Sequence, residues 1–138
     1  MSATPRRLIF VNLPVRDLDA SKAFFSKLGF TFNAQFTDEK AACMVINDGA
    51  SYAMLLTEPF FRSFTKRQPC DTSSQTEAMI ALACDSKEEV DSMLATAVGA
   101  GGAEAGPAQD HGFMYGRSFY DPDGHHWEIF WMNPAHVQ

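Results

Sequence analysis

The sequence predicts an α+β protein built from two modules with the same element order, a strand, a helix and then three strands. Two observations indicate it. Apolar residues recur at helical spacing in two segments, Leu18–Leu28 and Val90–Ala97, and strand patterns flank each segment. The helices lie roughly seventy residues apart, which is too long for a solenoid period and indicates duplication of a half-domain. The predicted modules span residues 7–57 and 77–133, with a connector over 58–76.

The first module begins with an apolar, β-branched strand over Arg7–Val15. Asp17 and Asp19 offer capping carboxylates for the helix, and Gly29 ends it. Residues 30–37 alternate phenylalanine or alanine with polar side chains, which predicts an amphipathic strand. Two apolar segments around the hairpin signal Asp48-Gly49 predict the remaining strands, which cover 41–47 and 51–57.

The connector has a different character, because Pro59 and three phenylalanines precede a polar stretch. It predicts a short helical turn and a loop, and Phe60, Phe61 and Phe64 either cap the core or form a lid. The second module starts with a strand over Glu77–Cys84, and Asp85 or Ser86 caps its helix. Three later strands are predicted, around 103–105, 114–120 and 125–132.

The last strand carries the most informative residue. Asp121-Pro-Asp-Gly124 predicts a tight turn, since proline presets φ and the final glycine supplies a positive φ. After the turn, His126, Glu128 and Phe130 alternate with Trp127, Ile129 and Trp131, so the two sets face opposite sides of the strand. A carboxylate in the middle of an aromatic strand makes Glu128 the candidate catalytic residue.

Composition restricts the function classes. The net charge of −6 argues against nucleic acid, because phosphate binding needs clustered lysine and arginine. No stretch is long enough for a membrane span, and the N-terminus lacks the apolar run of a secretory signal, so we expect a cytoplasmic protein. Three widely spaced cysteines predict neither disulfides nor a zinc site. Cys43 and Cys84 lie in apolar patterns and are expected to be buried.

The chain resembles the vicinal oxygen chelate superfamily, which includes glyoxalase I, bleomycin-resistance proteins and extradiol dioxygenases. Three segments carry the resemblance, and they read VNLPVRDLDASKAFFSKLGF (Val11–Phe30), MIALACDSKEEVDSML (Met79–Leu94) and GRSFYDPDGHHWEIFW (Gly116–Trp131). It implies two βαβββ modules whose strands form a curved mixed sheet around a shared cavity, the glyoxalase/bleomycin-resistance fold. It also implies a homodimer. Function is not settled by fold and has to be argued from the site.

In metal-dependent members of that superfamily, four His, Gln or Glu ligands come from the first and last strand of each module. The corresponding positions here are Phe10, Leu55, Met79 and Glu128. One hard carboxylate with Phe, Leu and Met cannot satisfy a divalent cation. We therefore expect no cofactor and no metal site. Zn, Ni, Mn or Fe would bind only if the ligand register were different from this one.

Leu55, Met79 and several polar and aromatic side chains are expected to contact a ligand instead. Asn12 is polar on an apolar strand, and Phe10, Phe119 and Phe130 suit a flat or apolar molecule. Tyr115, Arg117 and Phe119 share one face of the penultimate strand. If that face turns inward, Arg117 pairs with Glu128 or a substrate anion; if it turns outward, Gly116 and Ser118 line the pocket. His126 converges on Glu128, although both His125 and His126 are expected at the surface near the turn.

Three functions fit these residues. The first is a metal-independent protein that binds a small organic molecule, apolar or aromatic, as the drug-resistance members of the superfamily do. The second is a glyoxalase-type lyase or isomerase, in which a metal polarises a carbonyl. The third is a metal-free enzyme with Glu128 as general base. The first is our prediction; iron dioxygenase chemistry is disfavoured because no two-His, one-carboxylate set is found.

Overall fold

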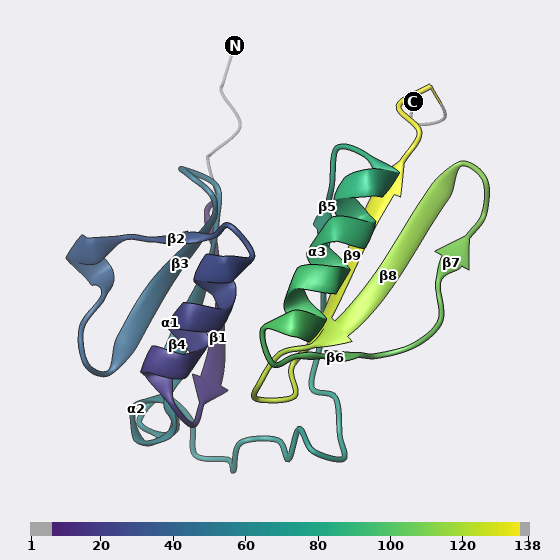
Figure 1. Cartoon of the computed structure of the whole chain (residues 1–138). Coiled ribbons are helices and arrows are strands. Elements are labelled where there is room, and N and C mark those ends of the chain that lie inside the picture. The colour runs from purple at the N-terminus through teal and green to yellow at the C-terminus, as the bar shows by residue number, and fades with distance from the viewer. Residues whose placement is uncertain (1–6, 136–138) are drawn as a thin grey trace. The chain divides into compact units, whose positions relative to one another are not determined.

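The computed structural model describes residues 7–135 and divides into two compact units, one ending at Pro69 and one beginning at Cys70 (Figure 1). The boundary lies inside the connector predicted over 58–76. The first unit has the predicted order of one strand, one helix and three strands, and the second unit has the same order with one additional two-residue strand, Gln109–Asp110. The α+β class is therefore confirmed, and both units repeat the order of a strand, a helix and further strands. Within the described range, no helix combines the length and the apolar character needed to cross a membrane.

The first unit contains a four-stranded sheet in the order β1-β4-β3-β2, with β1 parallel to β4 and the other neighbours antiparallel. Its elements are β1 (Ile9–Val15), α1 (Leu18–Lys27), β2 (Thr31–Phe32), the 3-10 helix η1 (Ala34–Phe36), β3 (Ala41–Asn47), β4 (Ser51–Thr57) and α2 (Glu58–Arg62). The side chain of Asp17 caps α1 by accepting a hydrogen bond from Ala20 N at 3.1 Å, as the sequence predicts.

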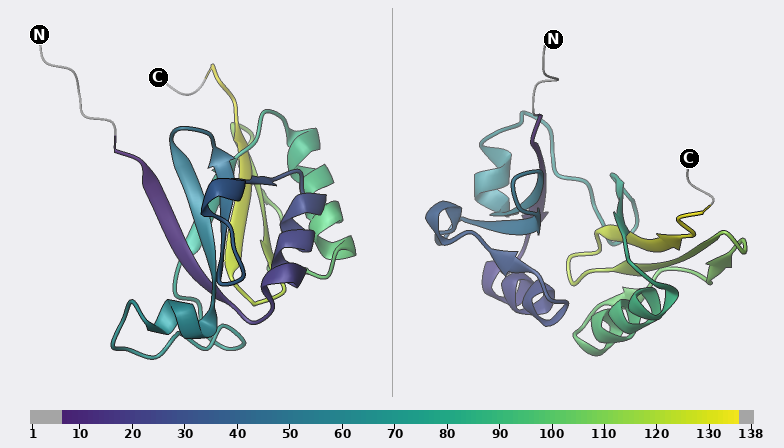
Figure 2. Two further views of the ribbon diagram at one scale, coloured as in Figure 1. Left: turned by 90° about the vertical axis from the view of Figure 1, so that its left-hand side faces the viewer. Right: turned by 90° about the horizontal axis from the view of Figure 1, so that it is seen from above.

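Helix α1 covers one face of this sheet, while α2 packs against the end of the opposite face and leaves the rest of that face open (Figure 2). Leu13, Val15 and Leu55 are buried on the covered face. Phe10 and Asn12 alternate with them on β1, are exposed, and belong to the open face. The Phe10 ring stacks on Tyr52 with the ring centroids 4.9 Å apart.

The prediction of a strand over residues 30–37 is wrong for most of that range. Only β2 pairs there, and η1 follows it. The side chain of Asn33 accepts a hydrogen bond from Gln35 N at 3.0 Å, while the Thr37 hydroxyl donates to Asn33 O at 2.7 Å. Such local side-chain bonds offer the backbone an alternative to the strand ladder. The alternation of apolar residues does not reveal this competition.

The second unit contains a sheet in the order β5-β9-β8-β6, with β7 also paired to β8. Its elements are β5 (Met79–Ala83), α3 (Lys87–Gly99), β6 (Ala103–Glu104), β7 (Gln109–Asp110), β8 (Met114–Tyr120) and β9 (His126–Met132). Strand β5 is parallel to β9, and the other pairs are antiparallel. Helix α3 packs against β8 and β9 (Figure 2).

The ends of β5 and α3 refine the sequence predictions. Strand β5 is shorter than the predicted strand, so Glu77 and Cys84 lie outside it, and Cys84 is only half-buried. Cys43 is buried, as predicted. Helix α3 is capped by Ser86, whose hydroxyl accepts from Glu89 N at 3.1 Å, and the Glu89 carboxylate accepts in return from Asp85 N at 2.6 Å.

The phenylalanines of the connector are divided between α2 and the loop after it. Helix α2 packs against β1 and β4, with Phe60 and Phe61 half-buried. Phe64 is 70% exposed, and its ring meets Phe60 edge to face at 5.0 Å. Phe64 therefore does not cap the core, which corrects that expectation. A lid role for the segment stays a prediction.

The Asp121–Gly124 turn is confirmed, and a preceding loop packs tightly on it. Gly124 has φ +84° and its N–H donates to Asp121 O at 2.9 Å. A Cβ atom at Gly124 would lie 2.6 Å from the carbonyl oxygen of Thr72. The Thr72 hydroxyl donates to Asp123 O. Glycine is thus required here for its positive φ and for the close approach of another backbone.

We expect Gly124→Ala to destabilise the protein more than Gly112→Ala, as urea unfolding would measure. Both glycines have positive φ, but nothing lies within 4 Å of a Cβ added at Gly112. Gly112→Ala should cost about 1–2 kcal/mol for the left-handed backbone. Gly124→Ala should cost roughly a further 1–3 kcal/mol, because the methyl group displaces the Thr72 backbone. Equal losses would show that the loop does not restrain the turn.

Candidate functional site

The open face of the second sheet is built by the alternate residues of three neighbouring strands. On β9 these residues point away from α3, and they are His126, Glu128, Phe130 and Met132. Trp127 and Ile129 point the other way and are fully buried. This two-residue alternation confirms the two faces predicted for the strand. It places the functional candidates of β9 together on the side that α3 does not cover.

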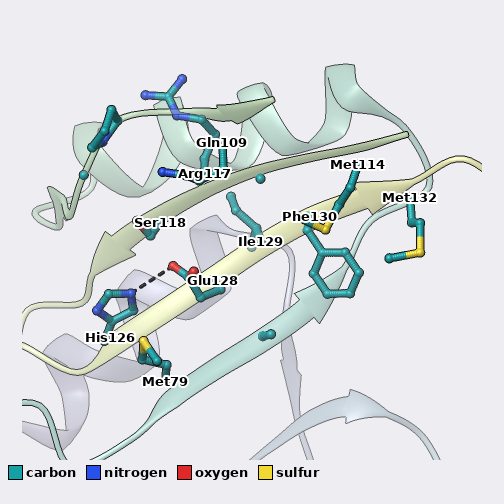
Figure 3. Close-up of a pocket in the computed structure, with 14 residues that line it drawn as sticks. Met79, Gln109, Met114, Arg117, Ser118, His126, Glu128, Ile129, Phe130 and Met132 are labelled. Carbon is teal, nitrogen blue, oxygen red and sulfur yellow. Dashed lines mark hydrogen bonds and ion pairs between the residues drawn. The ribbon is translucent and has the colours of Figure 1, made fainter. Parts of the chain in front are cut away.

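A cavity of about 510 Å³ lies over this face (Figure 3). It is lined by Met79, Ala81, Gly106, Pro107, Gln109, Met114, Gly116, Arg117, Ser118, His126, Glu128, Ile129, Phe130 and Met132. Figure 3 shows two ends with different character: Met114, Phe130 and Met132 gather at one end, while Ser118, His126 and Glu128 lie at the other. The volume and the apolar walls are typical of sites for small organic molecules.

The polar end contains an imidazole–carboxylate pair. His126 Nε2 lies 2.9 Å from Glu128 Oε2. The Tyr120 ring meets the His126 ring edge to face at 5.5 Å and so helps to hold it. Glu128 is 39% exposed at its side chain, and its Oε1 accepts no hydrogen bond from residues 7–135. One carboxylate oxygen therefore remains available to a ligand.

Tyr115, Arg117 and Phe119 share one face of β8, as predicted, but that face is the one covered by α3. The Arg117 guanidinium contacts Glu104 at 2.5 Å and Asp91 at 3.8 Å. The Tyr115 hydroxyl donates to Asp91 at 2.6 Å, and Phe119 is buried. Tyr115 and Phe119 do not line the cavity, which corrects their assignment as ligand contacts.

Of the two orientations that the sequence leaves open for β8, the structure has the one with Gly116 and Ser118 in the cavity. Arg117 belongs to the cavity lining, yet its charged group is held by the two acidic side chains on the opposite face. It does not pair with Glu128. The alternation of β8 allows only one of these sets to face the cavity.

The expectation that His125 lies at the surface is wrong. His125 is 1% exposed, and its Nδ1 lies 2.7 Å from Glu77 Oε1. It has the same parity as Trp127 and Ile129, so it points toward the core rather than the cavity. That shared parity was a signal available in the sequence. His126, which points the other way, is half-buried and lines the cavity.

The positions that resemble a metal site do not fit a divalent cation. Leu55 is fully buried on the α1 face, and the strand register instead places Met54 beside Asn12 on the open face. This corrects Leu55 as a ligand contact. Phenyl and aliphatic groups offer no lone pair, and thioethers are poor ligands for hard cations. Across residues 7–135, no three His, Cys, Asp or Glu side chains are grouped to hold a metal.

Burial disfavours the reactive form of two of the three cysteines. Burial, together with the carboxylates of Glu89 and Asp85, raises the pKa of the Cys84 thiol to about 11. Burial also raises the pKa of the Cys43 thiol. The reactive form of cysteine is the thiolate, which is scarce at neutral pH when the pKa is this high.

Comparisons with known proteins agree on one superfamily. Residues 7–129 match the profile of the Glyoxalase/Bleomycin resistance protein/Dioxygenase superfamily. The hypothetical protein SA1046 from S. aureus is 30% identical, with a TM-score of 0.74 over 93% of this chain and 95% of that one. No curated protein matches.

Two more distant structures carry functional names. The fosfomycin resistance protein FosX from Mesorhizobium loti is 15% identical, with a TM-score of 0.68 over 96% of this chain and 98% of that one. Lactoylglutathione lyase from Agrobacterium tumefaciens is 18% identical, with a TM-score of 0.65 over 93% and 95%. At these identities the likeness shows the fold alone.

Double-mutant cycles, measured by urea unfolding, test the orientation of Arg117. We expect Arg117→Met and Glu104→Gln to be coupled by about 0.5–1 kcal/mol, since the pair is partly exposed. Arg117→Met and Glu128→Gln should be additive within about 0.3 kcal/mol, because their charged groups lie on opposite faces. Coupling of Arg117 to Glu128 instead of Glu104 would place the guanidinium in the cavity.

Proposed function

Since the chain belongs to the Glyoxalase/Bleomycin resistance protein/Dioxygenase superfamily, we propose that it binds a small organic molecule on the open face of its second sheet, without a metal ion. The observation that carries this proposal is the cavity of about 510 Å³, in which apolar walls surround a single carboxylate. Cavities of about 300–1,000 Å³ with few polar groups are typical of small-molecule sites.

The residues at the four metal-ligand positions favour binding of a small molecule over metal-assisted catalysis. A glyoxalase-type lyase needs a metal that polarises a carbonyl, and the residues at the ligand positions do not fit one. The neighbours named for fosfomycin resistance and for lactoylglutathione lyase share the fold of this chain, so either activity would rest on fold likeness. An apolar or aromatic ligand is favoured by Met114, Phe130 and Met132.

The proposal also covers the oligomeric state and the cellular compartment of the protein. We propose a cytoplasmic homodimer. The superfamily resemblance supports the dimer. The three cysteines, all free, are compatible with a reducing compartment.

One observation favours a second candidate, a metal-free enzyme. The 2.9 Å contact between His126 Nε2 and Glu128 Oε2 places an acid–base pair at the polar end of the cavity. In that role, Glu128 would accept a proton from a bound substrate, and His126 would orient the carboxylate.

Gly116→Val tests the location of the binding site. A Cβ atom at Gly116 would lie at the ordinary distance of 3.7 Å from Ile129 O and from Phe130 Cβ, so the backbone accepts a side chain there, and Gly116 lines the cavity. We expect compounds found by a thermal-shift screen of a chemically diverse collection to bind this variant at least about tenfold more weakly.

The matched control is Tyr115→Phe, which alters the same strand on the face toward α3. It should retain wild-type affinity for the same compounds. If these compounds bind Gly116→Val as well as they bind the wild type, or if no compound binds the wild type, the proposed site is wrong.

Glu128→Gln separates the two candidate functions. For a binding protein, we expect NMR spectra of a bound compound to show no conversion by the wild type, with only its affinity changed in the variant. For an enzyme, the wild type would convert the compound, and the variant would lose about 100-fold or more in rate, because the amide cannot accept the proton. Conversion by the wild type would contradict our first proposal.

A further inference from the structure

We infer that the ligand is a planar aromatic molecule that carries a protonated amine a short linker away from its ring. This inference rests on the proposed binding function and names the chemical class that the cavity selects. Three features of the open face carry it: the small residues beside Glu128, the space beside Phe130, and the distribution of charge.

Glu128 is accessible from both neighbouring strands. The register pairs it with Ala81 on β5 and with Ser118 on β8. Side chains at paired positions are the nearest neighbours on one face of a sheet. A methyl group and a hydroxymethyl group cannot cover the carboxylate, whose Oε1 accepts no hydrogen bond from the described part of the chain. A ligand donor can therefore approach Glu128 directly.

The residue paired with Phe130 on the neighbouring strand has no side chain. This residue is Gly116 on β8, and the nearest atoms to a Cβ added there are 3.7 Å away. The backbone conformation at Gly116 does not require glycine. The absence of a side chain there leaves open space at the floor of the cavity. A flat ring can lie over Gly116 against the Phe130 ring, with Met114 and Met132 around it (Figure 3).

The charges of the lining favour a cation. Among the residues that line the cavity, Glu128 is the one with a carboxylate and Arg117 is the one with a guanidinium. The Arg117 guanidinium is held by Glu104 and Asp91 toward α3. The neighbouring His126 occupies Oε2 and leaves Oε1 for the ligand. A bond between an ammonium and a carboxylate is stronger than one between neutral partners, and an anionic ligand would be repelled.

The spacing of the two subsites sets the length of the ligand. Glu128 and Phe130 are two residues apart on β9, which is about 7 Å along a strand. A three-carbon chain between a phenyl ring and an ammonium group covers this distance. The suitable probe is therefore the 3-phenylpropylammonium ion.

The test compares four probes by NMR titration of the full-length protein. They are 3-phenylpropylammonium, the neutral 3-phenyl-1-propanol, the anionic 3-phenylpropanoate and the ring-free hexylammonium. We expect the first to bind the most tightly, with an affinity for Glu128→Gln about tenfold lower, because the carboxylate charge is lost. The affinity of 3-phenyl-1-propanol should change less than about twofold. Gly116→Val should weaken all three aromatic probes.

Glu88→Gln is the matched control, since it removes the same charge from the first turn of α3. It should leave every affinity unchanged. If the aromatic probes bind and Gly116→Val weakens them, but charge and Glu128→Gln have no effect, the amine inference is wrong and the proposed site stands. If hexylammonium binds as tightly as the phenyl probe, the aromatic part is wrong. If neither these probes nor the screened collection bind, both proposals are wrong.

Discussion

The buried carboxylate of Asp121 holds the turn from which β9 starts, and the open face of the second sheet depends on the register of that strand. Asp121 Oδ1 accepts from Asp123 N at 2.9 Å and His125 N at 3.0 Å, while Oδ2 accepts from Trp127 Nε1 at 3.0 Å. Burial raises the pKa of the Asp121 carboxyl, and His125 and the hydrogen bond from Trp127 oppose that shift. A slip of one residue would expose Trp127 and bury Glu128.

The same turn connects the cavity to the loop before β5. The Thr72 hydroxyl donates to Asp123 O, and the Thr72 backbone packs directly against Gly124. His125 contacts Glu77, which lies two residues before β5 begins. Strand β5 then pairs with β9 and brings Met79 and Ala81 to the cavity. Residues that never touch a ligand therefore position the ones that do. Because large side chains such as Trp127 pack on the α3 side of the sheet, small residues such as Gly116 and Ser118 can line the cavity on the opposite face.

The sequence predicted those parts of the site that depend on one strand alone. Alternation along β9 was enough to place Glu128, His126 and Phe130 together, and the proline and glycine of Asp-Pro-Asp-Gly were enough to predict the turn before it. The orientation of Arg117 could not be predicted, because either face of β8 was compatible with its pattern. Asn33 shows the same limit in the first module, where a side-chain bond to the backbone replaced a strand. Leu55 depended on the register between β1 and β4, which the sequence does not contain.

Metal content is the most direct test of the central claim that the cavity binds an organic molecule without a metal. Purified protein would be dialysed against nickel, zinc, manganese and iron(II) salts, then against metal-free buffer, and measured by elemental analysis beside Glu128→Gln. Our account predicts far less than one metal ion per chain and no difference between the two proteins. One ion per chain in the wild type, lost in Glu128→Gln, would contradict it and make Glu128 a metal ligand.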